Sequence, residues 1–394
     1  MRYISADYIF PISSSPIKNG TVVIDDSGII IEVAKSEIQN TKSEIYQGII
    51  CPGFINAHCH LELSHLKGVI SEGTGLTGFI GEFLQKRKQF GEESIKEKII
   101  EAENEMLANG IIAVCDISNN DSTFEQKAKL KLFYHTFIEL FDLIPEKAKE
   151  TFEHGKEIQN SFQSKWDKIQ SSLTPHAPYS VSFELLKMIS DDALKNNSNI
   201  SIHNQETESE NDLFQNKTGK ILELFKKLNI NLEHLPLTGK SSLQSYLGLL
   251  PKENKILLVH NTFTKKEDIQ FAHQYSKNIY WCFCPNANLY IENKLPDYKI
   301  FIDENATCCV GTDSYASNWS ISILDELKTI SKHSPKIPLQ TILQWATLNG
   351  AEFLGVGNQF GSLEKNKKPG LNLIENVDLE NLRLTQITKI KKLA

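Results

Sequence analysis

The pattern of hydrophobic and polar residues changes at Gly53. From there on, short apolar runs alternate with longer stretches in which apolar residues recur with helical periodicity. The runs are FINAHCH, IIAVCDIS, KLFYHTFIEL, SSLTPHAPY, NISIHNQE, ILLVHNTF, IYWCFCPNAN and CCVGTDS. Their length and their content of β-branched and aromatic residues indicate buried strands. Helical periodicity fills most of the intervals, at residues 94–109, 145–160, 182–196, 217–228 and 265–275. Eight strands alternating with helices predict an α/β protein with a (β/α)8 TIM barrel.

Both ends of the chain have a different pattern, in which short β runs are separated by turn residues. RYISADYIF, NGTVVIDDSG and IIIEVA precede the barrel, and GSLEKNKKPGLNLIENV follows it. Neither end has enough strands to be stable alone. We therefore expect one small composite β-sandwich domain, built from residues 1–50 and 356–394, beside a barrel of residues 51–355.

Polar side chains occur where the predicted strands end. His58 and His60 close the first strand, and because side chains alternate along a strand, both imidazoles should point the same way. The later strands end in Asp116, Glu139, His176, His203, His260, Asn288 and Asp313. Solvated strand ends would explain scattered Asp and Asn, but not histidine on four of eight strands. In a (β/α)8 barrel these ends meet at the catalytic face.

Composition and charge narrow the partners. The 394 residues carry a net charge of −7, with 40% hydrophobic and 23% charged residues. The balance argues against a nucleic-acid or anionic membrane surface and favours a small-molecule substrate. We expect a cytoplasmic protein, because the N-terminal segment lacks a signal-peptide core and no apolar run is long enough to span a membrane. The seven cysteines, mostly in apolar runs, predict buried free thiols. A homodimer is left open.

The strand-end histidines and Asp313 have the chemistry of a metal site. Three imidazoles and a carboxylate, with one position for water, are typical of a catalytic rather than a structural metal. Such an ion would lower the pKa of a bound water toward about 7. Glu206 follows His203 by three residues, where a carboxylate can carry protons beside the metal without binding it. Asp313 and His260 are placed to orient or deprotonate the water.

The motifs PGFINAHCH, PHAPYS, IHNQET, VHN, CPNAN and GTDS occur in an order that resembles the amidohydrolase superfamily. Within it, the chain resembles the mononuclear metal-dependent deaminases, which include cytosine, guanine and S-adenosylhomocysteine deaminases and the chlorotriazine hydrolases. The resemblance covers essentially the whole chain. It implies one divalent metal, zinc in preference to iron, and catalysis by Glu206, His260 and Asp313. The implied metal ligands are His58, His60, His203 and Asp313.

The same resemblance implies hydrolytic deamination of an aminated heterocycle, in which Glu206 protonates a ring nitrogen and ammonia leaves. The run HLELS is similar to aminofutalosine deaminases, so we expect an adenine nucleoside derivative as substrate. The alternatives are guanine, cytosine or a triazine, the last as a deaminase or chlorohydrolase. Substrate contacts are expected from Glu62, Phe79, His176 and Asn288.

Three rival interpretations fit less well. A dinuclear cyclic-amide hydrolase usually holds its second metal with a carboxylated lysine near the end of the fourth strand, and SLTPHAPYS has no lysine. The unrelated zinc deaminases pair His-x-Glu with Pro-Cys-x-x-Cys. His60 and Glu62 match the first half, but the order Cys282-Phe283-Cys284-Pro285 does not match the second. A non-catalytic scaffold would be expected to lose ligands, and all are present.

Overall fold

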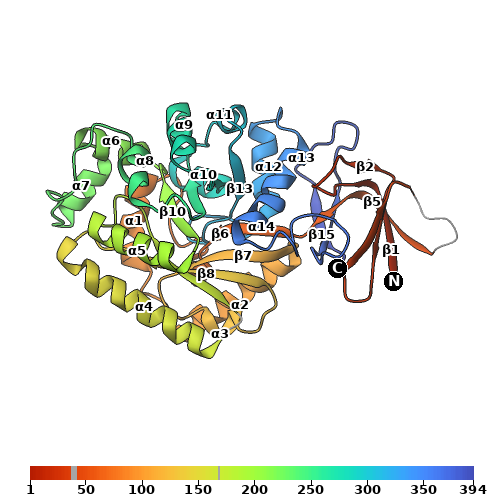
Figure 1. The fold of residues 1–394 in the computed structure, drawn as a ribbon, viewed down its shortest axis with the longest axis horizontal. Helices are drawn as coiled ribbons and strands as arrows, with labels where there is room; N and C mark the ends of the chain where they lie inside the picture. The colour runs from red at the N-terminus through yellow and green to blue at the C-terminus, as the bar shows by residue number, and fades with distance from the viewer. Residues whose placement is uncertain (37–41, 167–168) are drawn as a thin grey trace.

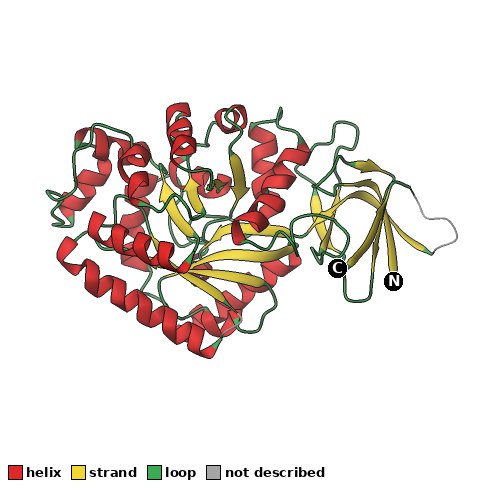
Figure 2. Ribbon diagram, viewed as in Figure 1, coloured by secondary structure: helices red, strands yellow, loops and turns green. Residues whose placement is uncertain are grey.

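The computed structural model describes residues 1–36, 42–166 and 169–394, and these form two parts (Figures 1 and 2). The larger part has helices packed around central strands. The smaller part is a β-sheet that holds both chain termini, at the right of Figure 1. No helix among the described residues combines the length and apolar character needed to cross a membrane.

The larger part contains two four-stranded parallel sheets, in the orders β6-β7-β8-β9 and β10-β11-β12-β13. The sheets meet at both edges: a parallel bridge joins Cys59 to Asp313, and the amide of His203 donates to the carbonyl of His176 at 2.9 Å. The predicted (β/α)8 barrel is therefore confirmed. The strands are β6 (Phe54–Cys59), β7 (Ile111–Ser118), β8 (Phe133–Leu140), β9 (Gln170–Pro175), β10 (Ile200–Asn204), β11 (Ile256–His260), β12 (Ile279–Phe283) and β13 (Thr307–Val310).

The helices between the strands overlap all five predicted ranges. They are α2 (Glu92–Ala108), α4 (Ala148–Lys165), α5 (Phe183–Asn196), α7 (Lys220–Lys227) and α9 (Lys266–Tyr275). The other helices are α1 (Gly75–Lys86), α3 (Phe124–Lys127), α6 (Glu208–Asn216), α8 (Ser242–Tyr246), α10 (Pro285–Glu292), α11 (Tyr298–Asp303), α12 (Ile323–His333), α13 (Leu339–Trp345) and α14 (Leu348–Leu354). Short 3-10 turns are η1 (Leu61–Leu66), η2 (Pro145–Lys147) and η3 (Leu247–Leu249).

Helix α5 shows how local sequence defines one of these elements. The Ser182 hydroxyl caps its first turn by accepting the Leu185 amide, and Asn197 ends it in the left-handed conformation. Between the caps, an apolar stripe that includes Ile189 is buried against the barrel. The cap and the stripe together account for both the limits and the orientation of the helix.

The barrel strands are buried on both faces, as expected of parallel strands covered by helices. One buried cluster combines small strand residues, such as Ala57 and Ala113, with larger ones such as Phe137. All seven cysteines are free and buried, which confirms the prediction from their apolar context. This apolar packing inside the barrel fixes the positions of the strand ends and of the polar residues on them.

The smaller part is one seven-stranded sheet, in the order β15-β14-β5-β1-β3-β4, with β2 paired to β1. Its strands are β1 (Arg2–Ile9), β2 (Ile17–Lys18), β3 (Thr21–Ile24), β4 (Ile30–Ala34), β5 (Ser43–Pro52), β14 (Leu371–Glu375) and β15 (Lys389–Lys392). Strand β14 pairs with β5, so the two chain ends share this sheet. The buried Asn372 donates to the Gly110 carbonyl at 2.9 Å and so ties the sheet to the barrel.

Candidate metal centre

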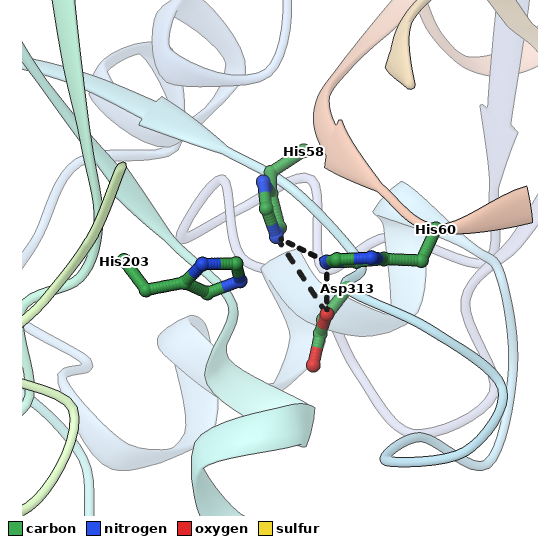
Figure 3. A group of neighbouring side chains, drawn as sticks. All are labelled: His58, His60, His203 and Asp313. Carbon is green, nitrogen blue, oxygen red and sulfur yellow. Dashed lines mark hydrogen bonds and ion pairs between the residues drawn. The ribbon is translucent and has the colours of Figure 1, made fainter. Parts of the chain in front are cut away.

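Four side chains from three barrel strands meet in one buried group (Figure 3). His58 and His60 come from the end of β6, His203 from β10 and Asp313 from the residues after β13, and their ligand atoms all lie within 4.8 Å of one another. The Nε2 atoms of His58 and His60 are 3.2 Å apart, and the Asp313 Oδ1 lies 3.6 Å and 3.4 Å from them. The i and i+2 spacing thus directs both imidazoles to one point.

The protonation states of this group suit a cation. Burial lowers the pKa of His60 to about 3 and that of His203 well below its usual value, so both imidazoles are neutral. Burial alone would raise the pKa of Asp313, but the hydrogen bond with His58 and the nearby imidazoles hold it well below the usual range. Neutral imidazoles and an ionised carboxylate are the forms that bind metal. The group therefore fits one divalent ion.

His203 is oriented by a backbone carbonyl. Its Nδ1 lies 2.7 Å from the carbonyl oxygen of His176, which can only accept, so Nδ1 carries the proton and Nε2 keeps its lone pair. A second possible ligand group among the described residues consists of Glu139, His176 and His203. It shares His203, whose Nδ1 is already bonded to the carbonyl. The first group is consequently the better metal site.

His260 and Glu206 lie beside the four ligands. His260 is buried at the end of β11, and its Nδ1 is 2.8 Å from the side-chain oxygen of Asn288, so Nδ1 donates and Nε2 is left free. That Nε2 is 3.7 Å from Glu206 Oε1. Burial raises the pKa of Glu206 to about 7, although His260 opposes the shift. The Glu206 carboxyl and the free Nε2 of His260 thus face each other.

At three residues of this face the backbone adopts the left-handed conformation, which residues other than glycine rarely adopt. The φ angles are 46° at Gln205, 74° at His260 and 56° at Asp313. For residues other than glycine such angles are unfavourable, and they persist where the surrounding structure enforces them. Here these conformations turn the backbone sharply where the strands end, at the face that carries the ligand and proton-transfer side chains.

The four residues predicted to contact the substrate lie in different surroundings. His176 is half-buried, with Nδ1 2.6 Å from the Ser180 hydroxyl and its ring 4.7 Å from that of His203. Glu62 is buried in η1 and accepts the Asn119 amide at 3.0 Å, and burial raises its pKa to about 8. Phe79 lies in α1 and stacks on Phe83 with 6.3 Å between ring centroids. Asn288 contacts His260. All four remain predictions as substrate contacts.

One buried ion pair, which contacts the segment carrying His60, was not predicted from the sequence. The ammonium of Lys127 lies 2.5 Å from Asp116, and both side chains are fully buried. Asp116 also accepts the amide of Leu61, the residue after His60, at 2.8 Å. The pair therefore supports the chain segment that carries His60. Lys127 lies in FEQKAKLK, which has the pattern of an exposed helix, so only its contacts show its role.

Comparisons with known proteins agree with this geometry. The chain is 26% identical over 379 residues to a 5′-deoxyadenosine deaminase of Methanococcoides burtonii, which covers 91% of this chain and 80% of that protein. It is 26% identical over 370 residues to an adenosine deaminase of Helicobacter pylori, which covers 89% and 87%. Among solved structures, Helicobacter pylori aminofutalosine deaminase in complex with methylthio-coformycin superposes with a TM-score of 0.80 at 25% identity, covering 95% and 92%.

A family profile covers most of the chain. The profile of the Amidohydrolase family matches residues 49–393, which include the barrel and the C-terminal strands of the small sheet. The four ligand residues, Glu206 and His260 all lie within the matched range. The chain belongs to the amidohydrolase family and is a hydrolase that acts on carbon–nitrogen bonds.

Proposed function

We propose that this chain is a metal-dependent hydrolytic deaminase that converts an adenine nucleoside derivative and releases ammonia. The observation that carries the proposal is the buried three-histidine, one-aspartate group next to the facing pair of Glu206 and His260. The substrate class is supported by the relatives, which are deaminases of 5′-deoxyadenosine, adenosine and aminofutalosine.

In this proposal His58, His60, His203 and Asp313 hold one divalent ion. Three imidazoles with one carboxylate suit both zinc and iron, and we take zinc as the first candidate and iron as the alternative. When bound, the ion would lower the pKa of a water at this site to about 7 and so supply a nucleophile at neutral pH.

The proton transfers of the reaction are assigned to side chains of the site. His260, held by Asn288 with Nε2 free, and Asp313 take the proton of the attacking water. Glu206 protonates the ring nitrogen next to the amine-bearing carbon, which makes that carbon electrophilic. The water oxygen bonds to the carbon, and the bond from that carbon to the amine nitrogen breaks. Ammonia leaves with the proton taken from the water, the second water proton returns to Glu206, and the ring nitrogen keeps the proton that Glu206 gave. A pKa of about 7 lets the Glu206 carboxyl both give and accept a proton near neutrality.

The substrate test is a comparison of kcat/KM by ammonia release. We expect adenosine, 5′-deoxyadenosine and nucleosides with bulky 5′ groups such as aminofutalosine to exceed free adenine, because binding energy from the sugar can be used at the reacting carbon. Cytosine and guanine serve as the competing classes. Efficient turnover of either, without activity on any adenine nucleoside, would overturn the substrate class and leave the metal site standing.

His176→Ala tests a contact beyond the reacting carbon. The His176 ring is half-buried beside His203, and Phe141, whose ring centroid is 6.2 Å away, is exposed. If this end of the site contacts the sugar, the variant should lose more kcat/KM on a bulky nucleoside than on free adenine. Equal losses on both would show that His176 acts through His203 instead.

Asn288 has two possible roles, and a pair of variants separates them. Asn288→Leu removes the acceptor for His260 Nδ1, and we expect kcat to fall about 10–100-fold, the range for a lost orienting partner, with metal content unchanged. Asn288→Asp retains an acceptor oxygen and should keep more activity. A rise in KM at constant kcat would instead favour direct contact with the substrate.

A further inference from the structure

The side chain of Glu206 has few polar contacts among the described residues. It is buried, and among the described residues none donates a hydrogen bond to its carboxylate; its Oε1 lies 3.7 Å from Nε2 of His260. Proton transfer requires the carboxylate to stay within reach of its partners. Its position must therefore come from the backbone that carries it.

That backbone is held by a second buried glutamate. Glu210, in the first turn of α6, accepts the amide of Gln205 at 2.9 Å with Oε1 and the amide of Glu206 at 3.3 Å with Oε2. Oε1 also accepts the hydroxyl of Ser242 in α8 at 2.6 Å. Both oxygens of one carboxylate are thus engaged, and two of the three bonds go to the residues that place Glu206.

An ordinary helix cap would use Glu210 differently. The sequence Thr207-Glu208-Ser209-Glu210 has the pattern of a capping box, in which the glutamate bonds the amide of the first residue of the box. Here the carboxylate bonds the two residues before Thr207. Its contacts therefore extend beyond the helix to the strand end.

The bonds also stabilise an unfavourable conformation. Gln205 has a φ of 46°, and this turn directs Glu206 away from the line of β10. The Gln205 amide group donates to Asp268 at 2.9 Å, and its oxygen accepts the Thr264 hydroxyl at 2.7 Å. Thr264 lies four positions after His260 along the chain. The same network therefore connects the backbones that carry both proton-transfer groups.

We propose that Glu210 is a positioning residue, which holds the Gln205–Glu206 backbone so that the Glu206 carboxylate faces His260 and the substrate. The inference rests on the proposed deaminase function for its kinetic consequence. The anchoring of the two amides can be measured without activity.

The main test uses Glu210→Ala and Glu210→Gln on the intact, metal-loaded protein with the best nucleoside substrate. A misplaced catalytic group costs up to about 100-fold, so we expect Glu210→Ala to lower kcat at least about tenfold. KM should change less than about twofold and metal content not at all. Glu210→Gln keeps one oxygen acceptor and should recover part of the loss. The matched control is Glu208→Gln, an exposed glutamate of the same turn, which should behave as wild type.

A double-mutant cycle with Glu206→Gln separates positioning from general stability. If Glu210 acts through Glu206, Glu210→Ala should have little further effect in the Glu206→Gln background. Equal fold losses in both backgrounds would overturn the proposal. Should Glu210→Ala fold poorly, Ser242→Ala removes only the hydroxyl bond to Glu210 and should give a smaller loss with the same non-additivity.

Hydrogen exchange of the segment 203–212 gives the readout that needs no substrate. The amides of Gln205 and Glu206 should exchange faster in Glu210→Ala than in wild type, while Glu208→Gln leaves them protected. Unchanged exchange would contradict the positioning role whatever the substrate is. A wild-type protein without deaminase activity would contradict the proposed function alone.

Discussion

His58→Ala is expected to remove both the bound metal and the activity. The imidazole supplies one of four donor atoms that lie within 4.8 Å of one another, and His58 is buried, so no solvent-exposed side chain can replace it. Losing the imidazole removes one of the four protein donors and leaves a gap at the end of β6, so we expect the ion to be held too weakly to stay bound through purification. The measurement is elemental analysis of the purified variant, followed by activity after reconstitution with zinc.

The control for this prediction is His154→Ala. His154 lies in α4 with 68% of its side chain exposed, so its loss should change neither metal content nor activity. Chelation of the wild-type protein should abolish activity, and added zinc should restore it, whereas His58→Ala should not recover. Activity that survives in a metal-free protein would contradict the assignment.

The number of metal ions is a separate outcome of the same experiment. The mononuclear arrangement predicts one ion per chain, because His203 is held by the His176 carbonyl and can serve only one of the two candidate groups through Nε2. Two ions per chain would contradict this. His176→Ala would then show whether the second ion uses the group of Glu139, His176 and His203.

The barrel, and the gathering of the candidate ligands on one face of it, could be predicted from local pattern, whereas the choice of the four ligands among them came from the family resemblance. Strand runs separated by helical stretches constrain the topology, and a parallel barrel gathers its strand ends on one face, so side chains far apart in sequence must meet there. His58 and Asp313 are 255 positions apart, yet both were assigned to that face from strand position. The prediction needed no knowledge of side-chain contacts.

The contacts that orient these groups could not be predicted in the same way. Asn288 was expected either to touch the substrate or to fix its loop, but its hydrogen bond with His260 joins residues 28 positions apart and depends on the tertiary structure. Lys127 has the sequence context of a surface lysine and is buried because Asp116 and two hydroxyls accept all three of its protons. Such partners are determined by tertiary structure, which strand and helix periodicity does not specify.

Glu206→Gln is expected to separate catalysis from metal binding. The amide has the shape of the carboxyl group but cannot exchange the proton that the reaction needs, so kcat should fall at least about 100-fold, the lower range for a lost general acid or base. Metal content should stay near the wild-type value, because Glu206 is outside the group of ligand atoms and its carboxylate faces His260, at 3.7 Å.

The metal measurement decides what a loss of activity means. If Glu206→Gln loses the ion together with the activity, Glu206 supports the ligands, and its assignment as proton carrier is wrong. Glu208→Gln is the control, since it makes the same change two residues away on an exposed position. A variant that keeps its metal and its substrate KM but loses kcat has lost an interaction made only in the transition state. That combination would assign proton transfer to Glu206, because both the ion and the bound substrate would still be in place.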